Sequence, residues 1–128
     1  MAPSTQPVLL VVDDNEAVGR LMAEILGSAG YEILLATCAE DAIRICDERL
    51  DPVDLVISDV LMPGISGVQL CEILAREKRA RRFLLMSALS PELWERRLPI
   101  LPKPFTMGEL LNAVREVLSQ PISREART

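Results

Sequence analysis

Short apolar runs, each about the length of one β-strand, recur along the chain and alternate with segments of helical periodicity. The five runs are Val8–Val12, Tyr31–Thr37, Val53–Ser58, Phe83–Met86 and Leu98–Leu101. Strands that are apolar throughout are typical of a parallel sheet covered by helices on both faces. Because strand-to-strand crossovers are right-handed, this pattern predicts an α/β fold with a doubly wound, five-stranded parallel sheet, flavodoxin-like, in the order 2-1-3-4-5.

Helical segments fill the intervals between these runs. Apolar residues three or four positions apart predict helices over 15–29, 39–50, 67–78 and 106–118, the last opened by the capping-box pair Thr106 and Glu109. Ser90 and Pro91 mark the start of another helix. Only 15 residues separate Ser87 from Lys103, so we expect this fourth helix to be short or irregular.

Length and composition describe one globular domain. The chain has 128 residues, 49% of them apolar and 26% charged, which fits a single core. We expect residues 1–7 to form an N-terminal tail, residues 8–118 the domain and residues 119–128 a polar C-terminal tail. The longest purely apolar run has five residues, and the N-terminus lacks the pattern of a signal peptide. Three scattered cysteines do not form a disulfide framework. These features favour a cytoplasmic protein without a membrane partner.

The absence of histidine excludes several chemistries. Without His there is no Ser-His-Asp or Cys-His catalysis, no His-based zinc site and no phosphohistidine on this chain. A formal net charge of −5 and only 3% aromatic residues argue against nucleic acid as a partner. The basic run over residues 76–82 follows a predicted helix, and we interpret it as a solvated helix end.

Chemically active residues stand where the predicted strands end. Asp13 and Asp14 follow the first strand, Asp59 the third and Ser87 the fourth, and the fifth leads to Lys103. All strands of a parallel sheet end at one edge, where ligands bind. Three carboxylates together repel one another unless a cation joins them, and Mg²⁺ prefers oxygen ligands. One ammonium and one hydroxyl then suit the oxygens of a phosphoryl group.

Within this group, Asp59 is the candidate nucleophile for aspartyl-phosphate chemistry because it stands alone on the central strand. The adjacent Asp13 and Asp14 are the candidate metal ligands. Lys103 is one of two lysines against twelve arginines, which favours a role for a compact ammonium.

The sequence resembles the receiver domain of two-component response regulators over residues 8–118. The motifs that carry the resemblance are Val11-Val12-Asp13-Asp14-Asn15, Ile57-Ser58-Asp59-Val60-Leu61-Met62-Pro63-Gly64 with Gly67, Met86-Ser87-Ala88 and Lys103-Pro104-Phe105. It implies that Asp59 is the phosphoacceptor, that Ser87 and Lys103 bind phosphoryl oxygens, and that the Lys103–Pro104 peptide is cis. It also implies a Mg²⁺ ion held by Asp13, Asp14, Asp59 and the backbone carbonyl of Leu61.

The resemblance further implies a signalling domain rather than an enzyme. A histidine kinase or phosphotransfer protein would donate the phosphoryl group, and contact with a downstream protein would pass the signal on, from a monomer or weak homodimer. The sequence departs from the family in having Ile100 where an aromatic residue usually stands, three residues before the lysine. For that reason we expect the output contact on another face, on the first helix or the loop after the third strand.

Other interpretations remain open at this point. The chain is either a stand-alone receiver or a receiver module of a hybrid histidine kinase, and a receiver-like scaffold not switched by phosphate is a further alternative. A haloacid dehalogenase-type hydrolase would need a second Asp two residues after the nucleophile, where Leu61 stands. A flavodoxin-like cofactor binder would not place Asp13 and Asp14 in its phosphate loop.

Overall fold

The computed structural model describes residues 6–88 and 98–121 and contains one parallel sheet. Its five strands lie in the order β2-β1-β3-β4-β5, which confirms the predicted fold. The strands are β1 (Val8–Val12), β2 (Glu32–Ala36), β3 (Leu55–Asp59), β4 (Phe83–Ser87) and β5 (Ile100–Pro102).

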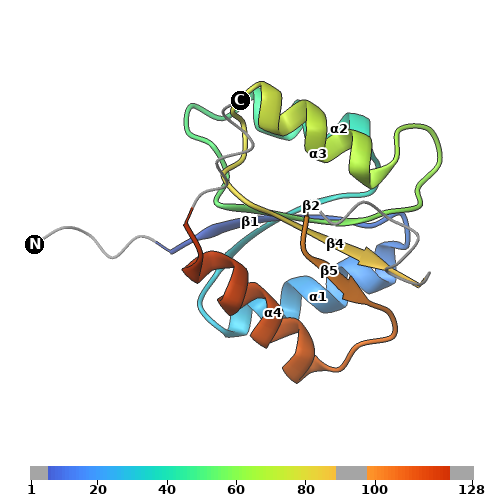
Figure 1. Ribbon diagram of the computed structural model, residues 1–128, viewed down its shortest axis with the longest axis vertical. Coiled ribbons are helices and arrows are strands. Elements are labelled where there is room, and N and C mark those ends of the chain that lie inside the picture. Colours follow the sequence, from blue (N-terminus) through green and yellow to red (C-terminus); the bar gives the residue numbers. More distant parts are fainter. Residues whose placement is uncertain (1–5, 89–97, 122–128) are drawn as a thin grey trace, which may run out of the picture.

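Helices cover both faces of the sheet. The bounds are α1 (Glu16–Ser28), α2 (Ala39–Asp47), α3 (Gly67–Arg76) and α4 (Met107–Ser119). Figure 1 shows α1 and α4 on one side and α2 and α3 on the other. The segment for which we expected a short fourth helix, Ser90 to Arg97, lies outside the described residues.

Two aliphatic cores, one on each face, explain why the strands are apolar throughout. Leu9 and Val11 pack with α1 and α4, whereas Leu10 and Val12 pack with α2 and α3. Successive strand residues point to opposite faces, and all four of these side chains are fully buried. Each buried aliphatic side chain contributes roughly 1.5–3 kcal/mol. The two cores therefore hold the strand ends, and with them the candidate site, in fixed positions.

Side-chain caps mark the starts of three of the four described helices. The side chain of Asn15 accepts a hydrogen bond from the Val18 amide at 3.2 Å, which caps α1. The predicted capping box of Thr106 and Glu109 is present at the start of α4. The predicted end of α3 at residue 78 was wrong: the helix ends at Arg76, because Lys78 adopts a left-handed conformation with φ 58°.

The basic run after α3 has partners within the chain. Arg79 lies 3.2 Å from the Asp47 carboxylate and donates to the Cys46 carbonyl at 3.4 Å. Arg82 donates through Nε and Nη2 to the Gln120 carbonyl at 3.0 and 2.8 Å. These arginines join segments that are far apart in sequence, so the run is more than a solvated helix end. No helix in the described part of the chain has the length and apolar character needed to cross a membrane.

Gly27 offers a position at which stability should increase. It lies in the last turn of α1, and a methyl group there would meet no atom within 4 Å. Gly27→Ala should therefore raise the free energy of unfolding by about 0.5–1 kcal/mol, because alanine loses less backbone entropy on folding. Chemical denaturation measures the change. Gly30→Ala is the control: with φ +104°, that position should lose stability, and a loss at Gly27 would contradict the prediction.

Candidate functional site

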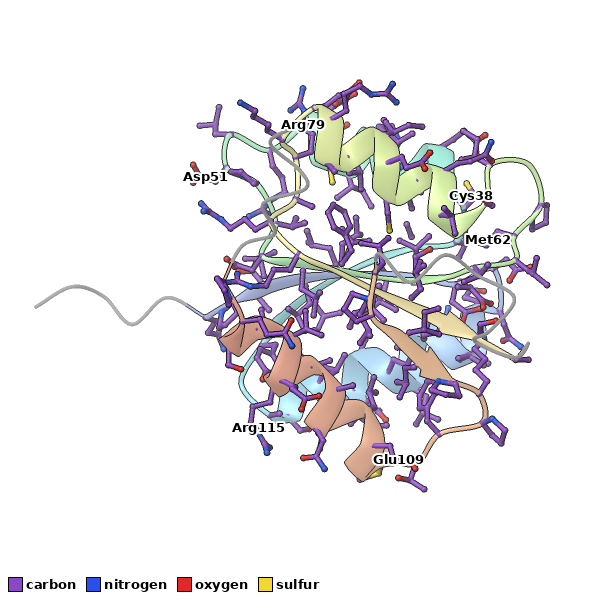
Figure 2. All side chains as sticks on the ribbon, in the orientation of Figure 1. Cys38, Asp51, Met62, Arg79, Glu109 and Arg115 are labelled. Carbon is purple, nitrogen blue, oxygen red and sulfur yellow. The ribbon has the colours of Figure 1, made fainter. Side chains whose placement is uncertain are left out.

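The residues predicted to carry chemistry lie at one end of the sheet. Asp59 and Ser87 are the last residues of β3 and β4, and Asp59 pairs in register with Met86. Backbone hydrogen bonds extend the ladder beyond the strands: the Val60 amide donates to the Met86 carbonyl at 2.9 Å and the Lys103 amide to the Ser87 carbonyl at 2.8 Å. Figure 2 shows this end near Cys38 and Met62, with Asp51 and Arg79 at the opposite end.

Three carboxylates meet there. Asp13, Asp14 and Asp59 each offer an oxygen, and these oxygens lie within 4.8 Å of one another. Asp13 is buried, Asp59 is partly buried and Asp14 is exposed. The Asn15 amide donates to Oδ1 of Asp13 at 2.9 Å, whereas the buried Oδ2 has no hydrogen-bond partner. The cluster therefore has a buried carboxylate oxygen that can coordinate a cation.

Lys103 extends from the end of β5 into this cluster. Its Nζ donates to Oδ2 of Asp59 at 3.1 Å and lies 3.5 Å from Oδ2 of Asp13, a distance typical of an ion pair rather than a hydrogen bond. The Lys103–Pro104 peptide is cis. Burial acts to lower the pKa of Lys103, but the hydrogen bond to Asp59 and the charges of Asp13 and Asp59 together raise it. The ammonium therefore stays protonated.

Asp59 is the carboxylate whose ionisation the fold opposes. Burial raises its pKa, and the negative charges of Asp13 and Asp14 add to that effect. The hydrogen bond and charge of Lys103 oppose the increase without cancelling it. The site thus holds more negative charge than its one ammonium neutralises.

This imbalance predicts a pH-dependent gain of stability in Asp59→Asn. A raised pKa in the folded state means that wild-type stability falls as pH rises from the ordinary value, 3.8, through the raised value. In metal-free buffer the variant should melt above wild type at about pH 7, and the difference should vanish near pH 3.5. Thermal unfolding by circular dichroism measures both. Asp51→Asn makes the same charge change at the opposite end of the molecule and should show no such gap; an equal gap would contradict the prediction.

The backbone of Asp59 is fixed by two residues that sequence reasoning did not single out for this purpose. Ser58 is fully buried and its hydroxyl donates to the Asp59 carbonyl at 2.9 Å. Gly67 lies against the same carbonyl, and its amide donates to the Val60 carbonyl at 2.8 Å. The glycine of the sequence motif was a visible signal; the hydroxyl contact was not.

Ser87 and Leu61 stand beside these groups. Ser87 is buried at the end of β4, and Leu61 follows Val60 in the loop before α3 with 60% of its surface exposed. Nothing in the geometry distinguishes the Leu61 carbonyl as a ligand, so its role stays a prediction.

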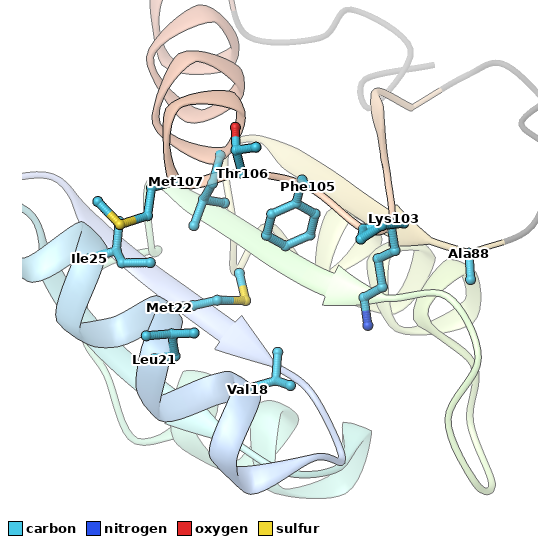
Figure 3. A pocket seen from close by; sticks show the side chains of 11 residues that line it. Val18, Leu21, Met22, Ile25, Ala88, Lys103, Phe105, Thr106 and Met107 are labelled. Atoms are coloured by element: carbon cyan, nitrogen blue, oxygen red, sulfur yellow. The ribbon is translucent and has the colours of Figure 1, made fainter.

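An apolar cavity of about 490 Å³ adjoins Lys103. It lies between α1 and the segment from Lys103 to the first turn of α4 (Figure 3), with Met22 and Phe105 among its lining side chains. Leu21 and Met107 at its rim are 56% and 61% exposed. The sequence pattern placed residues of α1 in the core and gave no sign of this cavity.

The five-stranded parallel sheet and the acidic cluster beside Lys103 place this chain in a class of α/β domains with an acidic pocket at the strand ends. The comparisons with known proteins identify the family. The chain belongs to the response regulator receiver domain family, whose model matches residues 9–115. It is thus a receiver domain of two-component signalling systems, a family of signalling domains that generally bind Mg²⁺ at an acidic pocket and interact with histidine kinases or phosphotransfer proteins.

Relatives and solved structures support this assignment. The chain is 32% identical to the sensor kinase CckA of Brucella abortus over 91% of its length, and 32% identical to the transcriptional regulatory protein CpxR of Klebsiella pneumoniae over 86%. It spans 13% and 48% of those proteins. The chemotaxis protein CheY4 of Vibrio cholerae superimposes with a TM-score of 0.80 at 25% identity, covering 88% of this chain and 99% of that one. The receiver domain of hybrid histidine kinase CckA gives 0.71 at 35% identity with the same coverage.

Proposed function

We propose that Asp59 is the phosphoacceptor of this receiver domain. The observation that carries the proposal is the 3.1 Å contact between Lys103 Nζ and Oδ2 of Asp59, within a cluster of three carboxylates at the ends of β1 and β3. A carboxylate is a competent nucleophile toward an activated phosphoryl group. Lys103 and Ser87 at the neighbouring strand ends supply a charge and a hydroxyl for the phosphoryl oxygens.

The donor set fits a Mg²⁺ ion. Asp13 contributes a buried carboxylate oxygen without a hydrogen-bond partner, and Asp14 and Asp59 contribute oxygens within 4.8 Å of it. Hard oxygen ligands of this kind, supplemented by waters and one backbone carbonyl such as that of Leu61, suit Mg²⁺. When bound, the ion neutralises charge that develops on the transferred phosphoryl group. Asp13, Asp14 and Asp59 would hold it.

Phosphorylation in this site exchanges one bond for another. An Asp59 carboxylate oxygen bonds to phosphorus while the bond from phosphorus to the imidazole nitrogen of the donor breaks, and that nitrogen keeps the electron pair. Lys103 stays protonated and pairs with one phosphoryl oxygen, while the Ser87 hydroxyl donates to another. Lys103 already pairs with the Asp59 carboxylate in the unmodified protein, so phosphorylation would transfer that ion pair to an oxygen of the phosphoryl group.

The source of the phosphoryl group is a histidine kinase or phosphotransfer protein, in the cytoplasm, where the three free cysteines Cys38, Cys46 and Cys71 stay reduced. Burial raises the pKa of the Cys71 thiol to about 12, which disfavours the reactive thiolate form. The downstream contact passes between proteins, and neither nucleic acid nor membrane takes part.

The similarity to CckA favours a second setting for the same activity. The CckA of Brucella abortus is a sensor kinase of which this chain covers 13%, and the receiver domain of a hybrid histidine kinase named CckA has been solved separately. A receiver module of a hybrid histidine kinase would take its phosphoryl group from the kinase part of such a protein. The chemistry at Asp59 is the same in both settings.

Acetyl phosphate tests the proposal directly. Wild-type protein incubated with acetyl phosphate and Mg²⁺ should gain one acid-stable, base-labile phosphoryl group by intact mass, and EDTA should prevent it. Asp59→Asn should abolish the gain, whereas Asp51→Asn, the same charge change at the opposite end of the molecule, should leave it unchanged. Wild-type protein that stays unmodified would favour the scaffold that is not switched by phosphate.

A further inference from the structure

Ser58 is a buried polar residue that the proposed chemistry does not use. Three polar residues are buried in the described part of the chain, Asp13, Ser58 and Ser87. Asp13 and Ser87 belong to the candidate site. Ser58 is fully buried, and its hydroxyl donates to the carbonyl oxygen of the next residue, Asp59, at 2.9 Å. The contact is made to the backbone of the proposed phosphoacceptor.

The Asp59 carbonyl needs this donor because α3 covers it. Gly67, the first residue of α3, lies so close that a Cβ atom there would overlap the carbonyl oxygen and come within 2.9 Å of the carbonyl carbon. Such a Cβ would also lie 3.0 Å from the Ser58 hydroxyl oxygen. A carbonyl buried without a donor is unfavourable by about 1–3 kcal/mol. The Ser58 hydroxyl thus provides a hydrogen bond to the Asp59 carbonyl, against which Gly67 packs.

Neighbouring backbone groups are bonded by other means. The Val60 amide donates to Met86 of β4, and the Val60 carbonyl accepts from the Gly67 amide. The Asp59 carbonyl is instead fixed by a side chain, at the point where the β-ladder ends. The orientation of this carbonyl fixes the torsion about the Cα–C bond of Asp59, and the carboxylate side chain branches from the same Cα. A rotation about that bond would therefore displace the carboxylate relative to Lys103 Nζ, which lies 3.1 Å from it.

We propose that Ser58 is a positioning residue, which holds the Asp59 carboxylate in the geometry for phosphoryl transfer by fixing the Asp59 carbonyl beneath the first turn of α3. This inference rests on the proposed role of Asp59. The proposal predicts that loss of the Ser58 hydroxyl lowers the rate of phosphorylation without weakening the binding of the phosphoryl donor, because reacting groups must be held within about 0.5 Å of the productive geometry.

The experiment compares Ser58→Ala, which removes the hydroxyl, with Ser58→Thr, which keeps it. Ile57→Val is the matched control, since Ile57 is the preceding residue of β3, is fully buried and faces the opposite core. Two quantities are measured on each folded variant: the dependence of phosphorylation rate on acetyl phosphate concentration, and the ¹³C chemical shifts of the Asp59 carbonyl and carboxyl carbons in metal-free protein.

Ser58→Ala should lower the saturating rate by about 10-fold, with the half-saturating acetyl phosphate concentration within about twofold of wild type. The Asp59 carbonyl resonance should shift as it loses its donor. Ser58→Thr should restore the rate, and Ile57→Val should lower the melting temperature without changing the rate or either resonance. If Ser58→Ala does not fold, Ser58→Cys replaces it. Because an S–H group is a weak donor, that variant should show a smaller decrease in the saturating rate and a smaller shift of the Asp59 carbonyl resonance.

Two outcomes would overturn the proposal. The first is a Ser58→Ala rate equal to that of Ile57→Val, which would leave Ser58 a structural role alone. The second is an unchanged Asp59 carbonyl resonance, which would remove the contact itself. Failure of the proposed function would give another result: wild-type protein would then gain no phosphoryl group on Asp59, and Ser58 could have no positioning role in that reaction.

Discussion

Replacement of Lys103 by methionine should slow phosphorylation from acetyl phosphate by about 100-fold or more. Methionine has a similar length and no charge. The change removes the single ammonium that lies 3.1 Å from Asp59 and 3.5 Å from Asp13. A preorganised charge directed at the oxygens of a reacting phosphoryl group acts most strongly where water is partly excluded, and Lys103 is only 25% exposed. The rate of incorporation, followed by intact mass, measures the effect.

Lys78→Met is the matched control. Lys78 is the only other lysine of the chain, and it is exposed beyond the end of α3, beside Arg79 at the opposite end of the molecule. The two variants therefore carry the same change in net charge. Lys78→Met should react at the wild-type rate. Equal slowing in both variants would assign the effect to net charge, and a wild-type rate for Lys103→Met would remove Lys103 from the mechanism.

The same substitution should change the pH dependence of stability. Asp59 has a raised pKa even with Lys103 beside it, and removal of the ammonium raises that pKa further. In metal-free buffer, Lys103→Met should lose about 1–3 kcal/mol of unfolding free energy at pH 7, because it leaves a partly buried carboxylate without its donor. The loss should shrink as pH falls through the titration of Asp59, because the protonated carboxyl no longer needs a cation.

Residue pattern alone predicted the parts of the molecule that depend on periodicity and strand order. The apolar runs predicted five strands, and the parallel arrangement brought Asp13, Asp59 and Lys103 to one end of the sheet, where the structure has them. These features follow from the two-residue and 3.6-residue periods and from right-handed crossovers. They do not depend on the detailed packing of any side chain.

Features that depend on close approach were not visible in the pattern. Ser58 lies in an apolar strand, and no periodicity distinguishes a serine that bonds its neighbour's carbonyl from one that fills space. The end of α3 was misplaced because Lys78, unlike glycine, gives no signal for a left-handed conformation. The cavity beside Lys103 lies between α1 and the segment from Lys103 to the first turn of α4. These segments are far apart in sequence, so no local pattern indicates the cavity.

Gly67→Ala should be the most destabilising single methyl addition among the described glycines. The added carbon would overlap the Asp59 carbonyl oxygen and lie 2.9 Å from its carbon, both backbone atoms, so neither can rotate away. Relief requires the first turn of α3 to move away from β3, which breaks the 2.8 Å bond from the Gly67 amide to Val60. Overpacking is unfavourable by about 1–3 kcal/mol, or up to roughly 10 °C in melting temperature for a domain of this size.

Gly108→Ala provides the control for this change, because Gly108 also lies in the first turn of a helix but meets only the Thr106 hydroxyl oxygen, at 3.9 Å. That variant should be neutral or more stable by about 0.5 kcal/mol. A displaced α3 would no longer pack against the Asp59 carbonyl, so the Asp59 backbone would be less fixed. Gly67→Ala should therefore react slowly with acetyl phosphate even at temperatures where it is fully folded. Equal melting temperatures for the two alanine variants would show that β3 and α3 are not packed as closely as the geometry requires, and would remove the physical basis for a fixed Asp59 backbone.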